Sequence, residues 1–247
     1  MEPREFDTMA RVEDSYWWYL GLRARLTWAL RAEVGERRPR RILDVGCGTG
    51  ANLCALRALF PASTVVGVDI ADTALRHAHR RGCAALTCAS AAALPFPDAR
   101  FDVLLFADVL SDAGVDERAA LAEAHRVLRW GGVLAANVPA FACLRGAHDA
   151  AVESARRYRR ANVAQLLVDA GFTIRRLTYW NTLLFPLAWT VRRLRRMPVG
   201  SPTSDLVRLP HVVDAALTAI LAGEARVAHW IPMPFGTSVL AVAAKRD

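Results

Sequence analysis

A glycine-rich turn between an apolar run and a helical run constrains this chain most. Arg41–Gly50 reads RILDVGCGTG, so an apolar, β-type run ends at Asp44 and three glycines follow it. Glycine allows a tight turn and lets a ligand approach the main chain without meeting a Cβ. The helical run Ala51–Leu59 comes next, and a helix start presents unpaired N–H groups. A strand, a glycine turn and a helix start together predict a site for part of a nucleotide.

A second carboxylate strengthens this interpretation. Asp69 lies in another apolar run, Thr64–Ile70, 19 residues after Gly50. In a doubly wound sheet, that position places a carboxylate beside the glycine turn, where it can accept hydrogen bonds from both hydroxyls of a ribose. On these residues alone, a dinucleotide, another nucleotide-bearing cofactor and a purely structural turn all stay open.

Apolar and helical runs alternate along the chain. We expect, in order, strand 41–45, helix 50–59, strand 64–69, helix 72–81, strand 83–88, strand 101–107, helix 116–128, strand 132–138, helix 161–170, strand 172–180 and strand 236–244. This alternation predicts an α/β fold, a parallel sheet with helices on both faces. With 247 residues and 53% hydrophobic composition, the chain suits one domain, residues 1–247, with a large core.

Two segments extend this domain. Residues 1–38 include the helical periodicity of Tyr16–Val34 and predict an N-terminal helical cap on the core of residues 39–180. Residues 181–235 separate the last two strands, and so long a connection is not a hairpin turn. We expect a helical insertion there, before the last strand at 236–247. It suits a lid over an apolar substrate, a dimer surface, or a peripheral membrane contact through apolar and arginine-rich neighbours.

Several segments resemble one family. DVGCGTG at Asp44–Gly50 resembles motif I of bacterial class I S-adenosyl-L-methionine (SAM)-dependent methyltransferases. Ser90–Phe96 and Leu128–Gly132 resemble the segment after the third strand and the turn before the fifth strand in the methyltransferase-11 group, with tryptophan in place of the turn's proline. Tyr16–Tyr19 and Pro234–Ala243 also resemble a subgroup of these enzymes. The resemblance therefore covers most of the chain.

The resemblance implies SAM as cofactor and a Rossmann-like, seven-stranded, mostly parallel sheet whose last strand is antiparallel beside the sixth. The acid and the glycine backbone of motif I would hold the methionine part, Asp69 would hold the ribose, and Ser90 takes the place of the acid that meets adenine. Aromatic residues before the first strand often cap this pocket, and Arg23 can pair with the methionine carboxylate. The implied cofactor-binding residues are Asp44, Gly46, Cys47, Gly48, Asp69, Ile70, Ser90, Ala91, Ala107, Trp18 and Arg23.

Candidate catalytic residues follow from the chemistry that this cofactor implies. Methyl transfer from a sulfonium is an in-line displacement, so holding the reactants in place supplies much of the catalysis. A general base adds to it when the acceptor is a hydroxyl or a carbon acid. The candidates are His148, Asp108 and Tyr158: His148 lies in an Ala-His-Asp element of the subgroup, and Asp108 follows the fourth strand.

Two departures from the subgroup fall near these candidates. The usual DVLEH after the fourth strand reads DVLSD at Asp108–Asp112, and the usual Gly-His pair before Arg156 reads Glu153-Ser154. Two histidines that would face the acceptor are therefore missing. This keeps two alternatives open: a SAM-binding protein with a non-methylating reaction such as cyclisation, and a non-catalytic binding or membrane-surface protein.

Composition limits the partners. The net charge of +8 comes from arginine, since Lys245 is the only lysine among 32 basic residues. That pattern suits a compositional bias, whereas a nucleic-acid site needs a clustered basic face, so we expect no nucleic acid partner. His77 and His79 do not share a helix face, so we expect no metal site. Five cysteines without a CxxC pair, and no signal peptide, indicate a cytoplasmic protein with reduced thiols.

The favoured function is methyl transfer to a small, largely apolar molecule in bacterial secondary or cell-envelope metabolism. The sequence does not decide between a monomer and a homodimer, nor does it identify the acceptor atom.

Overall fold

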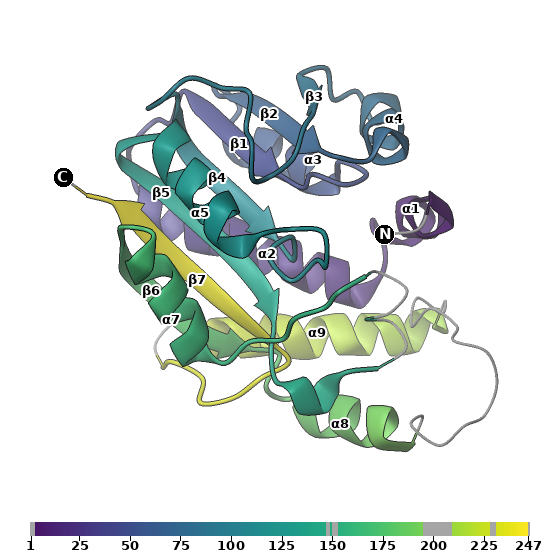
Figure 1. The fold of residues 1–247 in the computed structure, drawn as a ribbon. Coiled ribbons are helices and arrows are strands. Elements are labelled where there is room, and N and C mark those ends of the chain that lie inside the picture. The colour runs from purple at the N-terminus through teal and green to yellow at the C-terminus, as the bar shows by residue number, and fades with distance from the viewer. Residues whose placement is uncertain (1–2, 147–148, 150–152, 195–208, 228–230, 247) are drawn as a thin grey trace.

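A seven-stranded sheet forms the centre of the computed structural model, which describes residues 3–146, 149, 153–194, 209–227 and 231–246 (Figure 1). The strand order is β3-β2-β1-β4-β5-β7-β6. The strands are β1 (Arg41–Val45), β2 (Thr64–Asp69), β3 (Leu86–Cys88), β4 (Phe101–Ala107), β5 (Leu128–Pro139), β6 (Phe172–Trp180) and β7 (Ser238–Lys245). The helices are α1 (Pro3–Val12), α2 (Trp17–Val34), α3 (Ala51–Leu59), α4 (Asp72–Arg80), α5 (Glu117–Val127), α7 (Arg160–Asp169), α8 (Phe185–Leu194) and α9 (His211–Val227), with a 3₁₀ turn η1 (Ala142–Leu144).

The sheet is parallel from β3 to β5, and β7 runs antiparallel between β5 and β6. The expected fold class, a mostly parallel seven-stranded sheet with β6 and β7 as neighbours, is confirmed. Side chains of α5 and α7 join the core on one face of the sheet, and those of α2, α3 and α9 join the core on the other. Because both faces are covered, β4 and β7 read as almost continuous apolar runs.

Two strands begin three or more residues away from the expected position. β3 begins at Leu86 and not at Cys83, because Cys83 packs beneath α4 in a small apolar cluster. β5 begins at Leu128, because Leu128 already pairs with Phe101 of β4, ahead of a register shift between the two strands. The segment Leu128–Gly132, expected as a turn before the strand, is therefore part of β5, and Gly131 in it has a positive φ of 72°.

Within the expected N-terminal helical cap of residues 1–38, a separate helix before Tyr16, α1, was not expected. Its buried side chains Phe6 and Val12 lie on the side that meets α4. The first residues are strongly charged, which obscures this apolar spacing. The charges are used in packing: His77 on α4 lies 2.9 Å from Asp7, and the Arg81 guanidinium lies 2.7 Å from both Glu13 and Asp14. These contacts hold α1 against the carboxyl edge of the sheet.

The insertion between β6 and β7 is helical in its described part. A Cβ on Gly21 of α2 would overlap the Leu221 side chain, so the glycine permits close packing of α9 on α2. The buried Glu224 carboxylate accepts three backbone N–H groups, those of Asn181, Thr182 and Leu183, at 2.5, 2.7 and 2.9 Å. Glu224 therefore fixes the chain where it leaves β6. No helix in the described residues is long and apolar enough to cross a membrane.

Candidate functional site

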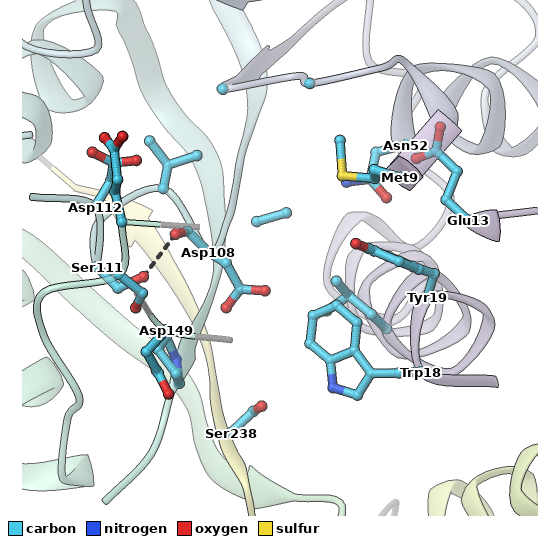
Figure 2. Close-up of a pocket in the computed structure, with 18 of the residues that line it drawn as sticks. Met9, Glu13, Trp18, Tyr19, Asn52, Asp108, Ser111, Asp112, Asp149 and Ser238 are labelled. Carbon is cyan, nitrogen blue, oxygen red and sulfur yellow. Dashed lines mark hydrogen bonds between the residues drawn. The ribbon is translucent and has the colours of Figure 1, made fainter. Parts of the chain in front are cut away.

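A cavity of about 780 Å³ opens at the carboxyl ends of β1, β2 and β4. Its wall is built from α1 and α2 on one side and from the loops after β4 and β5, with α8, on the other. Figure 2 shows Trp18 and Tyr19 of α2 across the cavity from Asp108 and Ser111. Segments from the two ends of the chain therefore meet around one space, at the edge where ligands bind in such sheets.

The glycine turn after β1 packs so closely against its neighbours that two of its positions have no room for a Cβ. The backbone N–H groups of Gly46 and Cys47 both donate to the Val68 carbonyl, at 2.7 and 2.9 Å. Gly46 has a φ of 70°, and a Cβ there would overlap the Val109 side chain. Gly50 has a φ of 92°, and its Cβ would lie 2.9 Å from Ala78. The turn can therefore present its main chain to the cavity only as glycine.

Asp44 lies beneath this turn and does not line the cavity. It is fully buried, and neither carboxylate oxygen has a hydrogen-bond partner among the described residues. Burial, and after it the charge of Asp69, raise its pKa well above the usual range. A buried acid without a donor is costly to keep charged. A cationic group bound above the glycine turn would favour the charged form of Asp44. The site therefore suits a cofactor that carries a positive sulfonium group.

Asp69 both braces the turn and faces the cavity. Its two oxygens accept the N–H groups of Gly48 and Ala71 at 2.8 and 2.9 Å. Burial raises its pKa, against these hydrogen bonds. The carboxylate keeps acceptor capacity for a ligand hydroxyl, since each oxygen carries two lone pairs. Ile70 follows it with an apolar side chain that is 73% exposed at the cavity edge.

The other expected cofactor residues divide into two groups. Gly46, Cys47, Gly48, Ser90, Ala91, Ala107 and Trp18 line the same cavity as Asp69 and Ile70. Arg23 is not among the lining residues: its guanidinium donates to the Glu13 carbonyl at 2.5 Å. Glu13 in turn accepts the hydroxyl of Thr49 in the turn. Arg23 therefore holds the chain that joins α1 to α2, and its expected pairing with a methionine carboxylate stays a prediction.

Asp108 occupies the end of β4 in an unusual conformation. Its φ is 62°, although it is not glycine, and its backbone N–H donates to the Asn137 carbonyl at 2.9 Å. Its carboxylate points into the cavity (Figure 2) and accepts the Asn137 side-chain amide at 2.9 Å. Burial raises the pKa of Asp108 to about 7, against the Asn137 hydrogen bond and the Arg157 charge. Strained backbone at a cavity-facing, pKa-shifted acid is typical of functional sites.

Residues behind Asp108 hold it in place. The buried Trp180 indole N–H donates to the Asn137 side-chain carbonyl at 2.7 Å, so Trp180, Asn137 and Asp108 form one hydrogen-bonded chain. Beside it, Arg157 donates to both oxygens of buried Asp149 at 2.8 and 3.0 Å. Sequence analysis did not single out Asn137, Trp180 or the Arg157–Asp149 pair as a unit, because these residues come together only across the folded sheet.

Comparison with known proteins agrees with this geometry. Residues 43–136, from β1 to β5, match the family model described as a methyltransferase domain. The chain is 38% identical over 122 residues to demethylmenaquinone methyltransferase of Thermus thermophilus, covering 47% of this chain and 55% of that protein. It is 33% identical over 162 residues to malonyl-[acyl-carrier protein] O-methyltransferase of Pseudescherichia vulneris, covering 64% and 63%. The solved structure of the [4+2]-cyclase SpnF has the same fold, with a TM-score of 0.59, 20% identity, and 90% and 81% coverage.

Residues 43–136 are a class I SAM-dependent methyltransferase domain. The cofactor of this domain is SAM, and the glycine turn, Asp44 and Asp69 lie within the matched residues. Their contact with the cofactor stays a prediction. The chain spans 55% and 63% of the length of these two curated relatives.

The methyltransferase domain and its C-terminal extension meet at the two departures from the subgroup. Asp112 and Ser154 pair as an isolated antiparallel bridge, and the Ala113 N–H donates to the Glu153 carbonyl at 2.9 Å. The N–H groups of Ala155 and Arg156 donate to the Ser111 carbonyl. Ser111, Asp112, Glu153 and Ser154 all line the cavity. Two changes far apart in the sequence therefore alter one patch of its wall.

The two remaining catalytic candidates are His148 and Tyr158. His148 lies outside the described residues. Tyr158 is buried and not among the lining residues: its hydroxyl donates to the Leu110 carbonyl at 2.7 Å and contacts Glu117. The hydroxyl thus holds the loop after β4, and a catalytic role for Tyr158 stays a prediction. No metal-binding cluster occurs in the described part of the chain.

Proposed function

We propose that this protein transfers the methyl group of SAM to a small, largely apolar acceptor, with Asp108 as the general base. The observation that carries the proposal is a carboxylate with a pKa of about 7 that points into the cofactor cavity (Figure 2). When bound, SAM supplies the methyl group and leaves as S-adenosylhomocysteine. Asp108 takes the proton that the acceptor atom loses, and Asn137 keeps the carboxylate turned toward that atom. A base with a pKa near the working pH is the most effective.

The charges of the cavity favour a neutral acceptor. The lining carries acids from both walls, among them Glu13, Asp108 and Asp112. Its two arginines both lie beside Asp149, Arg157 at 2.8 Å and Arg192 at 3.9 Å, so they do not offer a strong positive site. An anionic acceptor would meet like charge in this wall. The aromatic and aliphatic lining residues suit an apolar acceptor: Trp17, Trp18, Leu184, Leu187 and Leu217.

The relatives narrow the choice of assay. Their names give demethylmenaquinone and a malonyl group on acyl-carrier protein as acceptors. The acidic cavity favours the first, because a malonyl group brings a carboxylate. A place in bacterial secondary or cell-envelope metabolism stays a prediction that the neighbouring genes would check.

Cofactor binding is tested first, by calorimetry with SAM. Asp69→Ala removes the ribose acceptor, and we expect a loss of affinity of about 10- to 100-fold, as for a charged hydrogen bond of about 1.5–3 kcal/mol. Asp72→Ala is the matched control, since Asp72 is an exposed acid at the start of α4, three residues after Asp69. Equal affinity in both variants would rule out the ribose role of Asp69.

Methyl transfer is tested by release of S-adenosylhomocysteine with demethylmenaquinone and with malonyl-acyl-carrier protein. We expect release with the apolar acceptor, and its loss in Asp108→Asn. Asp98→Asn, an exposed acid paired with Arg126, is the control.

A second candidate is a non-methylating reaction such as cyclisation on the same cofactor-binding fold. The altered cavity wall at Ser111–Asp112 and Glu153–Ser154 favours it, and the [4+2]-cyclase SpnF shares the fold. Turnover of an acceptor with SAM left intact would support this candidate. A protein that binds neither SAM nor S-adenosylhomocysteine would instead favour the non-catalytic alternative.

A further inference from the structure

We propose that the outer surface of α8 and α9 docks on an anionic lipid bilayer, from which the apolar acceptor enters the cavity. We call this surface the α8–α9 face; it consists of Leu183, Leu187, Val191, Val212, Val213 and Ile220 with the exposed small residues of α9. The proposal rests on the apolar acceptor of the proposed function and adds where that acceptor comes from.

The α8 part of the face is an apolar stripe. Leu187 and Val191 are 54% and 38% exposed and lie four residues apart on one side of α8, and Leu183, 62% exposed, lies in the turn just before the helix. Trp189 is 45% exposed on a different side of α8, since residues two apart do not share a helix face, and it is not part of this stripe. Single exposed apolar residues are ordinary on soluble proteins, but three within nine residues beside a cavity opening are of the kind that marks an interaction site.

The α9 part is apolar over several turns. Val212, Val213 and Ile220 are 80%, 43% and 38% exposed, and the other exposed residues between them are alanines. The two acids of α9 do not contribute to this face. Asp214 accepts the Trp17 backbone N–H at 3.1 Å, and Glu224 is buried against the start of α8. The outer surface of the 17-residue helix α9 therefore carries no carboxylate from α9 itself.

The charge at the edges of the face is positive. Arg193 at the end of α8 and Arg226 at the end of α9 are exposed. The whole chain has a net charge of +8. Apolar side chains with flanking arginines are typical of surfaces that lie on anionic bilayers. A second copy of this chain is a poorer occupant, because a two-fold contact brings identical positive edges together.

The same residues connect the face to the cavity. Leu187 and Val191 are exposed on the outside and also line the cavity, together with Leu184, Ala188 and Leu217. Both helices therefore form the rim of its opening, and Figure 1 shows them at one end of the molecule. An apolar acceptor that leaves a bilayer there would reach the cavity without its apolar surface crossing water.

The test is co-sedimentation of the full chain with vesicles. We use phosphatidylcholine vesicles and vesicles of phosphatidylcholine and phosphatidylglycerol in equal parts, at low and high salt. We expect binding to the anionic vesicles that weakens with salt. Val212→Glu combined with Val213→Glu should reduce it by about tenfold or more, since both apolar contacts are lost. Neither residue lines the cavity.

Val168→Glu is the matched control, because Val168 is 57% exposed on α7, away from the α8–α9 face. Calorimetry with SAM checks that every variant is folded. Equal vesicle binding by the double variant and the control, or no binding by the native chain, would overturn the proposal. A dimer in light scattering that the double variant splits, without vesicle binding, would assign the face to a second copy. Loss of acceptor turnover with vesicle binding retained would instead count against the proposed methyl transfer alone.

Discussion

Asp108 ties the chemistry of this protein to pH. Its pKa of about 7 means that the carboxylate is protonated, and unable to accept a proton, below neutral pH. We expect the rate of methyl transfer to rise with pH through about 7 and then to level off. Asp108→Asn should lower kcat by about 10²- to 10⁴-fold, the usual worth of a general base, with SAM affinity nearly unchanged. A pH–rate profile of native protein and variant measures both; a flat native profile between pH 6 and 8 would exclude Asp108 as the base.

The same carboxyl also links pH to stability. Its pKa is raised in the folded protein, so its contribution is full below the unfolded value near 4 and is lost as pH rises through about 7. At pH 8 the folded protein holds a charged Asp108 at a cost of up to about 4 kcal/mol. Asp108→Asn should therefore raise the free energy of unfolding at pH 8 and change it little at pH 4. Denaturant titrations at the two pH values, with Asp98→Asn as control, measure the difference.

A substitution at Trp180 tests whether the hydrogen bonds from Trp180 through Asn137 hold Asp108 in position. Trp180→Phe keeps an aromatic ring in the core and removes the N–H that fixes the Asn137 amide. A less firmly held amide stabilises the Asp108 anion less, so the midpoint of the pH–rate profile should move upward, with a fall in kcat and little change in KM. A purely structural role would lower stability and leave the midpoint where it is in the native protein.

The glycine turn shows how one short element depends on the fold around it. Gly46→Ala places a Cβ against Val109 at a positive φ, so we expect loss of SAM binding and of stability. Gly82→Ala is the control, since Gly82 has a φ of 79° with open space around it and should cost only the backbone term, about 1–2 kcal/mol. Adding Val109→Ala to Gly46→Ala should recover part of the loss. Thermal unfolding and calorimetry with SAM separate these effects.

The sequence allowed the core elements to be predicted because their signals are local. β1, β2 and β4 have the expected bounds, since an apolar run between turn residues specifies a buried strand. The glycine turn and Asp69 follow from positions next to those strands. Helix α1 was missed, because its charges hide its apolar spacing and are satisfied by α4. The supports of Asp108 could not be foreseen either: Asn137 and Trp180 come from different strands, and no local pattern marks their contact.

The cavity joins parts of the molecule that are farthest apart in the sequence. Phe6 and Met9 of α1 line it, as do Asp69 at the end of β2 and Ser238 at the start of β7. A cofactor bound there contacts the folded arrangement only, so it should stabilise the whole domain by about 2.7 kcal/mol at a concentration 100-fold above its Kd. Protection against hydrogen exchange should therefore increase in α1 as well as in the turn at residues 44–50.

Hydrogen exchange with and without S-adenosylhomocysteine measures this coupling. α1 is held mainly through α4, by the contacts His77–Asp7 in the helix and Arg81–Glu13 just after it, and not by sheet hydrogen bonds, so it should open locally before the sheet does. The ligand should close that local opening, and Arg81→Ala should restore it without altering exchange in β6 and β7. Protection of the turn alone, with α1 unchanged, would mean that α1 is not part of the cofactor cover, and that the cavity is open on that side when the cofactor is bound.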